Sequence, residues 1–191
     1  DDNTVEFKLR PDVTWQDGSP FTANDVKFTF DRTIDGDARL AANGRYGLTA
    51  VEVVDDLTVR LITDGPRGTL LVLLSDPGSE IVPAEYFQEV GYEAFQQMPI
   101  GTGPYRVTEF VPDTRITFEA NENYWGGAPL AANVEVIGIP EVSTRVAALL
   151  NGEIDMAMDL PPDQVGTVEG GGDFVISSVS PLNTNIFAIV G

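Results

Sequence analysis

The side chains that could perform chemistry in this chain are carboxylates, hydroxyls and amines, because its 191 residues include no cysteine and no histidine. This composition excludes cysteine nucleophiles, Ser-His-Asp triads, thiolate zinc sites and imidazole metal ligands. It also excludes disulfide bonds, although a cysteine-free chain fits either redox compartment. We therefore predict no cofactor and no metal site.

Carboxylates are the most abundant of the remaining groups, with 30 Asp and Glu residues. A pair of carboxylates could hydrolyse a glycoside. In so acidic a chain some pair always looks suitable, and the pairs Asp55-Asp56 and Asp12 with Asp17 have the composition of turns, which Asp favours. We predict a protein that is not an enzyme and has no catalytic residues, with a carboxylate-based hydrolase as the least favoured alternative.

The charge of the chain excludes some partners. Eleven Lys and Arg residues stand against the 30 acidic ones, which gives a net charge of -19. Such a surface repels nucleic acid and anionic lipid, so we predict no nucleic-acid partner. The longest apolar runs, such as residues 70–74, are too short to span a bilayer. Residues 1–4 lack a signal-peptide pattern, and we expect the sequence to begin inside a mature, processed or trimmed protein.

The first stretch of the chain predicts a strand, a turn and a helix in quick succession. Residues 5–10 alternate between apolar and charged types, which is typical of a half-buried strand. Residues 17–20 (DGSP) have turn chemistry. Thr22 and Asp25 then have the spacing of a capping box ahead of an apolar run, which predicts a helix.

The middle of the chain predicts two hairpins with helices between them. The first hairpin spans residues 51–61, with Asp55-Asp56 as its turn. Residues 69–74 indicate a short buried helical segment, and Pro83 suits the first turn of a helix that runs through Val90. The second hairpin begins at Tyr105 and ends near Phe118. The aromatic pair Tyr124-Trp125 is expected to pack over its sheet.

The last third has a βαβ pattern. Residues 134–139 form a nearly continuous apolar strand, as expected for one buried on both faces. A helical stripe over residues 142–150 follows, and residues 154–158 form the returning strand, which we expect to lie parallel to the first through a right-handed crossover. A short helix after Pro161 and two further strands, residues 174–179 and 185–190, complete the prediction.

Three of these stretches together resemble one family. We call residues 15–26 (WQDGSPFTANDV) the first motif, residues 101–105 (GTGPY) the second motif and residues 145–155 the third motif. In this order and spacing they resemble extracellular solute-binding proteins of family 5, the dipeptide, oligopeptide and nickel class. The resemblance extends from Val5 to about Phe187.

The resemblance implies a fold and a function. The fold is α/β, the mixed-sheet lobe of a periplasmic binding protein of type 2, a two-lobed clamshell. Because family members are longer, residues 1–191 are expected to cover most of the first lobe, with about 180–191 crossing toward the second. The implied function is the substrate-binding component of an ABC importer. It would be a monomer, periplasmic or extracellular, with or without a lipid anchor, that delivers a small solute, most often a peptide, to a permease of the inner membrane.

The resemblance also implies a ligand-binding region. It places residues 41–46 in the first-lobe region that reaches the ligand, and residues 182–187 near the cleft. Amides and guanidinium groups there can pair with peptide amides or carboxylates. The absence of histidine disfavours direct imidazole coordination of nickel and leaves open a chelate bound through other groups. The predicted lining residues are Asn43, Arg45, Tyr46, Asn183 and Asn185.

One alternative remains beside the hydrolase. Because a fold does not determine a function, the same lobe could serve as a solute-sensing or interaction module. A membrane span and a signalling domain after the second lobe would favour the sensor.

Overall fold

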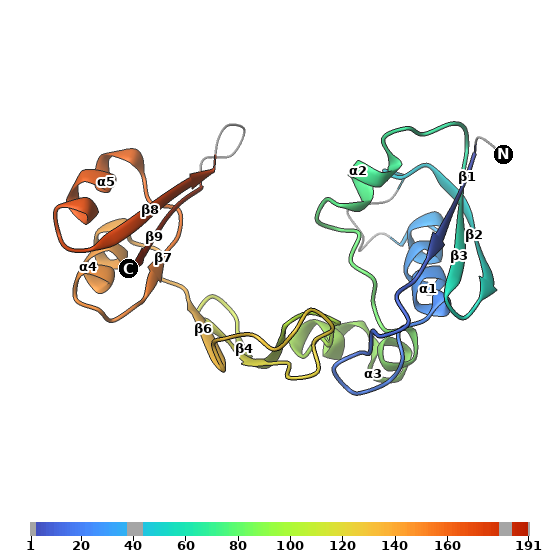
Figure 1. Cartoon of the computed structure of the whole chain (residues 1–191), viewed down its shortest axis with the longest axis horizontal. Coiled ribbons are helices and arrows are strands. Elements are labelled where there is room, and N and C mark those ends of the chain that lie inside the picture. Colours follow the sequence, from blue (N-terminus) through green and yellow to red (C-terminus); the bar gives the residue numbers. More distant parts are fainter. Residues whose placement is uncertain (1–2, 38–43, 180–184, 191) are drawn as a thin grey trace. The chain divides into compact units, whose positions relative to one another are not determined.

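The computed structural model describes residues 3–37, 44–179 and 185–190, with backbone alone for residues 178, 179 and 185–190. The chain forms two compact units, Asp1–Val136 and Ile137–Gly191, which are treated separately below (Figure 1). Among the described residues, no helix combines the length and the apolar character that crossing a membrane requires.

The first unit begins with an antiparallel sheet of order β1-β3-β2, formed by β1 (Thr4–Lys8), β2 (Leu48–Asp55) and β3 (Thr58–Thr63). The predicted strand and first hairpin are thereby confirmed, although the two residues between β2 and β3 are 56 and 57, one position later than expected. Helix α1 (Ala23–Ile34) packs against β2. The buried core between helix and sheet includes Val26, Phe30, Val51, Val59 and Leu61.

The predicted capping box at the start of α1 is confirmed. Thr22 is the N-cap, and its backbone N–H donates to the Asp25 carboxylate at 2.8 Å. Residues 17–20 turn as expected, with Gly18 at a φ of 89° that favours glycine. Trp15, just before this turn, is 3% exposed and packs edge-on against Phe21.

Two helices follow the first hairpin. Helix α2 (Leu70–Leu74) exists as predicted, but the expectation that the segment is buried is wrong for Leu71 and Val72, which are 61% and 64% exposed. The reason is geometric, because a helix of little more than one turn directs only part of its surface to the core, here Leu70. Helix α3 (Ala84–Gln97) follows Pro83, and Gly91 interrupts it at a φ of 79°.

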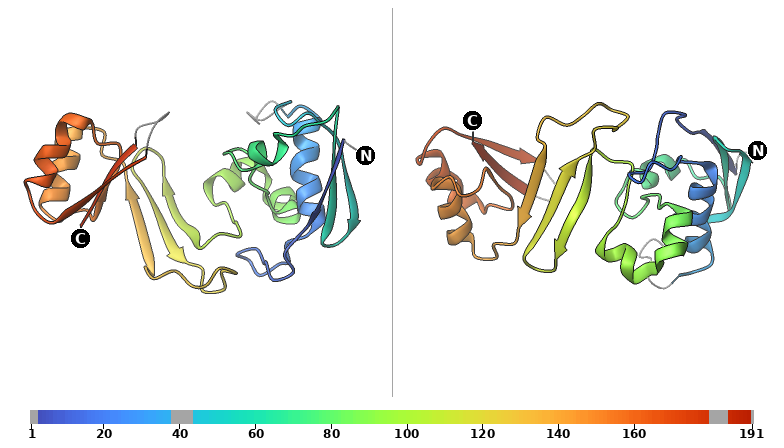
Figure 2. Two further views of the ribbon diagram at one scale, coloured as in Figure 1. Left: turned by 45° about the horizontal axis from the view of Figure 1, so that its top comes forward. Right: turned by 90° about the horizontal axis from the view of Figure 1, so that it is seen from below.

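A second sheet of order β4-β5-β6 completes the first unit, as Figure 2 shows in yellow to light orange. Strands β4 (Tyr105–Val111) and β5 (Arg115–Ala120) form the predicted second hairpin. The expected packing of the aromatic pair is not borne out for Trp125, which is 42% exposed. Its ring lies against Tyr124 and under the Arg10 guanidinium, 4.4 Å from the ring centroid.

The predicted parallel βαβ unit is wrong. Strand β6 (Asn133–Ile137) belongs to the sheet of β4 and β5, and Val136 and Ile137 are 48% and 46% exposed rather than buried on both faces. The returning strand β7 (Met156–Ala157) lies in a different sheet and pairs antiparallel with β9 (Asn185–Val190). An apolar run indicates a strand but not which strand it pairs with, and the prediction failed at that step.

The second unit packs two helices on a sheet of order β7-β9-β8. Helices α4 (Val142–Leu150) and α5 (Pro162–Glu169) and strand β8 (Phe174–Val179) lie where the sequence placed them. The core side chains of this unit are Val146, Leu149, Ala157, Leu160 and Val168.

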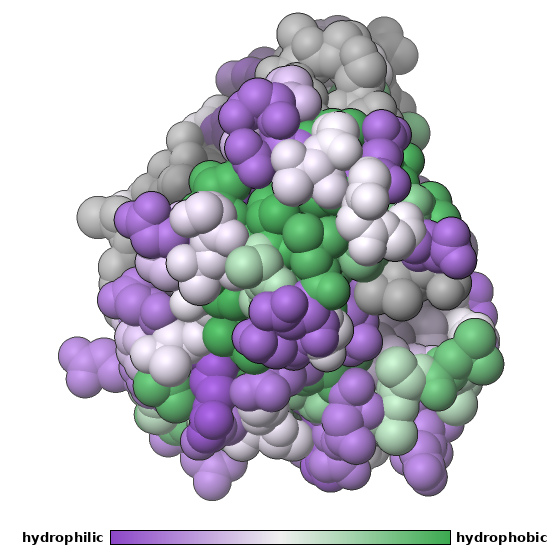
Figure 3. All heavy atoms as spheres, turned by 90° about the vertical axis from the view of Figure 1, so that its left-hand side faces the viewer, coloured by the Kyte–Doolittle hydropathy of each residue, from purple (hydrophilic) through white to green (hydrophobic). Residues whose placement is uncertain are grey.

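The two faces of this sheet differ. Ala157 and Ile176 share the register partner Ala188, and both side chains belong to the core or pack on it. Met156 and Val175 share the neighbouring partner, Ile189, and are 46% and 57% exposed. Because side chains alternate between the faces of a sheet, Met156 and Val175 lie on the face away from the helices. Figure 3 shows exposed apolar groups, coloured green, near the middle of one face of the molecule.

Candidate functional site

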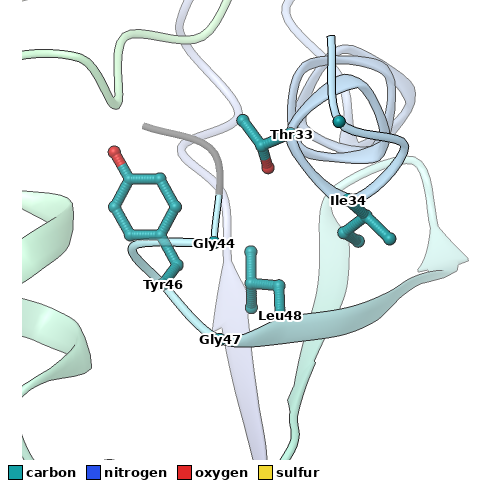
Figure 4. A pocket seen from close by; sticks show the side chains of 7 residues that line it. Thr33, Ile34, Gly44, Tyr46, Gly47 and Leu48 are labelled. Carbon is teal, nitrogen blue, oxygen red and sulfur yellow. The ribbon is translucent and has the colours of Figure 1, made fainter. Parts of the chain in front are cut away.

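A hollow of about 190 Å³ lies between the C-terminal end of α1 and the turn that leads into β2 (Figure 4). Gly44 and Tyr46, two of the described residues of the predicted binding loop, line it. The hollow is lined by Thr33, Ile34, Gly36, Gly44, Tyr46, Gly47 and Leu48.

Tyr46 is the largest side chain of this hollow. It is 1% exposed, and its ring meets that of Phe30 edge-on at 5.6 Å. Figure 4 shows its hydroxyl directed away from Ile34 and Leu48. This hydroxyl is buried and has no hydrogen-bond partner among the residues that the structure describes. A buried polar group without a partner costs about 1–3 kcal/mol, so an unused donor and acceptor at this position calls for an explanation.

Arg45 lies beside Tyr46 and faces the segment that follows α2. Its guanidinium forms an ion pair with the carboxylate of Asp76 and donates to the carbonyl oxygen of Pro77 at 3.2 Å. The guanidinium carbon also lies 5.9 Å from the centroid of the Tyr46 ring. Arg45 therefore connects the predicted binding loop to the segment that follows α2.

Gly47 sets the shape of the turn. Its φ is 59°, and a Cβ atom there would lie 2.1 Å from Nε of Arg67. Arg67 is held in this place by Asp64, to which it donates two hydrogen bonds. The Gly47 carbonyl in turn accepts the backbone N–H of Asp64 at 2.9 Å. Any side chain larger than hydrogen would disturb this packing.

The remaining predicted site residues are not assembled with this pair. Asn43 and Asn183 lie outside the described residues. Asn185 is the first residue of β9, where its backbone pairs with Val179, and its side chain is not described. Of the five, the structure brings together Arg45 and Tyr46.

A second hollow, of about 280 Å³, is lined by residues of the first motif and of the start of α3. Its buried anchor is Asp25, 7% exposed, which accepts hydrogen bonds from the indole N–H of Trp15 at 3.3 Å and from the backbone N–H of Ala84 at 2.9 Å. The sequence indicated the capping role of Asp25 but gave no signal for its bond to Ala84. Exposed carboxylates at its edge are those of Asp17, Glu85 and Glu89.

The carboxylates considered for catalysis behave as turn residues. The Arg10 guanidinium hydrogen-bonds to Asp12 and lowers the pKa of that carboxyl. The backbone N–H of Leu57 bonds to Asp55 and lowers its pKa as well. A general acid needs a raised pKa, so both shifts run opposite to that role. Among the described residues, no cluster of three or more acidic side chains could hold a metal ion.

The comparisons with known proteins agree with the three motifs. The family described as bacterial extracellular solute-binding proteins, family 5 Middle, matches residues 1–190. This chain belongs to family 5. The glutathione-binding protein GsiB of Pectobacterium atrosepticum is 33% identical to the family 5 chain over 175 residues, which are 87% of this chain and 32% of GsiB.

Solved structures confirm the fold. MoaA from A. tumefaciens R10, in complex with mannopinic acid, matches the family 5 chain with a TM-score of 0.87 and 30% identity over 93% of this chain and 36% of MoaA. DppA from Helicobacter pylori, in complex with the peptide STSA, matches with a TM-score of 0.80 and 27% identity over 93% of this chain and 39% of DppA. The predicted α/β lobe of a type 2 periplasmic binding protein is thereby confirmed. The chain spans about a third of the length of the curated relatives that it matches.

Proposed function

We propose that this chain is part of the substrate-binding component of an ABC importer and captures peptides or similar small solutes. The observation that carries the proposal is the family match along residues 1–190. The relatives narrow the class of solute. One is named for glutathione and another was solved with the peptide STSA, and both ligands present amide bonds and carboxylates. A peptide is therefore the favoured solute, and a permease of the inner membrane is the favoured partner.

The proposed place of the chain in the protein is most of the first lobe of a two-lobed receptor. The predicted crossing toward the second lobe at about residues 180–191 remains part of this proposal. The receptor would act as a monomer in the periplasm or at the cell surface. It would bind its solute without catalysing a reaction. The lowered pKa values argue against a general-acid role for Asp12 and Asp55 themselves.

The proposed ligand-binding residues of this lobe are those that the sequence predicted. Tyr46 is supported by its buried hydroxyl, which has no partner among the described residues and could bond to a solute amide. Arg45 could bind a solute carboxylate only in competition with Asp76. Asn43, Asn183 and Asn185 complete the proposed set.

Calorimetry tests the proposal. The natural full-length protein is titrated with reduced glutathione and with the peptide Ser-Thr-Ser-Ala, and the 191-residue chain is titrated in parallel. We expect the full protein to bind at least one of the two and the chain to bind it far more weakly, because a lone lobe offers part of the contacts and no closure. Equal affinity of the two proteins would contradict the two-lobed mechanism, and absence of binding by the full protein would contradict the peptide class.

The site within the lobe is tested by substitution in the full protein. Tyr46→Phe removes the hydroxyl and should lower the affinity about two- to tenfold, the range of one hydrogen bond. Tyr86→Phe is the matched control, because the Tyr86 hydroxyl bonds to the carbonyl of Met98 at an exposed position. Unchanged affinity in Tyr46→Phe would remove Tyr46 from the site.

A further inference from the structure

The first and second motifs are joined by one side chain, Gln16. Its carboxamide oxygen accepts the backbone N–H of Gly101 at 3.0 Å, and its Nε2 donates to the carbonyls of Tyr105 at 2.8 Å and Gly103 at 3.4 Å. Its backbone N–H donates to the Gly101 carbonyl at 3.1 Å. We call Gln16 and residues 101–105 the Gln16 junction. Both the oxygen and the nitrogen of the carboxamide thus bond to one turn.

Gln16 is held rigidly on its own side of the junction. The preceding residue, Trp15, is buried, and its indole N–H donates to Asp25. The backbone N–H of Trp15 donates to the Ser19 carbonyl at 2.8 Å, which closes the turn that follows. On the other side, Asn121 holds the same turn through the Gly103 and Pro104 carbonyls. The junction therefore connects two pre-formed pieces.

The junction matters because the sheet β4-β5-β6 has little else to hold it against the rest of the first unit. The hydrophobic core of that unit is built from residues between Val5 and Ile81, and none of its described members comes from this sheet. No strand of the sheet packs extensively against α1 or β1–β3 among the described residues. Arg10 over Trp125 is a further side-chain contact across this boundary, and Trp125 is 42% exposed.

We infer that the Gln16 junction is a latch, which fixes the orientation of the β4-β5-β6 sheet relative to α1 and the β1-β3-β2 sheet. We also infer that Gln16 is a positioning residue for solute capture. The first part stands on the geometry alone, and the second rests on the proposed function. No described residue of the β4-β5-β6 sheet belongs to the core of the first unit, so the hydrogen bonds at one corner hold the sheet in place. Their loss allows the sheet to rotate as a rigid body. Such a latch sets the orientation of the β4-β5-β6 sheet relative to the β1-β3-β2 sheet while a solute is bound.

The latch is tested by distances between two spin labels. The chain has no cysteine of its own, so Glu52→Cys on β2 and Thr114→Cys beside β5 give two specific labelling positions, both exposed. We expect one narrow distance distribution in this background. Gln16→Met keeps the length of the side chain and removes its hydrogen bonds, and we expect it to lose the single narrow maximum. Gln96→Met is the matched control, an exposed glutamine outside the junction, and should leave the distribution unchanged.

Two further measurements keep the outcome decisive. Gln16→Glu retains the acceptor for Gly101 but loses both donors, so it should broaden the distribution even if Gln16→Met folds poorly. Amide exchange in Gln16→Met, which removes the acceptor of the Gly101 N–H, should show loss of protection at Gly101 while α1 stays protected. A narrow distribution in both variants would overturn the latch, whatever their melting temperatures.

The capture role is measured separately in the full protein with reduced glutathione as the probe. Gln16→Met should weaken binding, while Gln96→Met should not. A loosened sheet with unchanged affinity would overturn the capture role and leave the latch. Because the label distances need no ligand, failure of the full protein to bind either glutathione or the peptide Ser-Thr-Ser-Ala would count against the proposed function and not against the latch. If it binds the peptide alone, the peptide is the probe.

Discussion

The Oδ1 atom of Asp25 accepts a hydrogen bond at 2.9 Å from the backbone N–H of Ala84, so one carboxylate in the first turn of α1 also holds the first residue of α3. Its Oδ2 atom accepts the backbone N–H of Thr22 at 2.8 Å and the indole N–H of Trp15 at 3.3 Å. The first motif and the start of α3, which are far apart in sequence, thus meet at one side chain. The first motif therefore serves as a structural centre of the first unit.

Replacing Asp25 should be costly. Asp25→Ala leaves four donors without their acceptor, two of them backbone groups, and we expect the free energy of unfolding to fall by about 2–4 kcal/mol. Urea denaturation measures the change. Asp31→Ala on the same helix is the control, because its ion pair with Lys27 is exposed and contributes about 0.3–0.5 kcal/mol. Equal losses in the two variants would contradict the central role of Asp25.

Tyr46→Phe should leave stability unchanged or raise it slightly. The hydroxyl is buried without a partner among the described residues, so its removal eliminates a desolvation cost of about 1–3 kcal/mol and no hydrogen bond. Tyr105→Phe, whose hydroxyl donates to the Ala131 carbonyl at 3.1 Å, should instead lose about 0.5–1 kcal/mol. Thermal unfolding of both variants makes the comparison. A clear loss in Tyr46→Phe would mean that the hydroxyl is satisfied.

Gly47→Ala should destabilise the turn that precedes β2. Alanine at a φ of 59° is strained, and its Cβ would collide with the Arg67 guanidinium, so we expect a loss of about 1–3 kcal/mol. Gly65→Ala is the matched control, because no atom lies within 4 Å of a Cβ at that glycine. If Arg67 simply moves aside, the measured loss will fall to about 1 kcal/mol, the conformational cost alone.

The carboxyls of Asp12 and Asp55 should titrate below their ordinary pKa of 3.8. Because the folded-state pKa is lowered, each ionised group stabilises the fold above the unfolded pKa, and this contribution is lost as the pH falls through the folded value. Carboxyl NMR titration measures both midpoints. Arg10→Met should raise the midpoint of Asp12, which depends on the Arg10 side chain, and leave that of Asp55, which depends chiefly on the Leu57 N–H.

Substitutions on β8 should distinguish the two faces of its sheet. Ile176→Thr places a hydroxyl against the core of the second unit and should cost about 1–3 kcal/mol. Val175→Thr exchanges a side chain that is 57% exposed and should change stability by less than about 0.5 kcal/mol. Chemical denaturation compares them, and a reversed order would contradict the register of β8.

Local signals explain what the sequence could predict. The capping box at Thr22, the strand at Val5 and the two hairpins depend on neighbouring residues, and all are confirmed. The errors concern long-range choices. No pattern in residues 134–139 shows that β6 joins the sheet of β5, and no pattern around Asp25 points to Ala84, 59 residues away.

The candidate site was less accessible to prediction for the same reason. The composition of the loop indicated Arg45 and Tyr46, but the pairing of Arg45 with Asp76 depends on how two loops meet. The lack of a partner for the Tyr46 hydroxyl is a property of the packed hollow. Gln16 has no sequence signal of its own, because all its partners are backbone atoms of a distant turn.

Those backbone partners have a consequence for how the protein can vary. The hydrogen bonds from Gln16 and Asn121 to residues 101–105 that the structure describes all go to main-chain atoms. The side chains of that turn, such as Thr102, can therefore be exchanged during evolution or design as long as the path of the main chain is kept. Gln16 cannot be exchanged in this way. The junction is therefore kept only where both the Gln16 side chain and the main-chain path of residues 101–105 are kept.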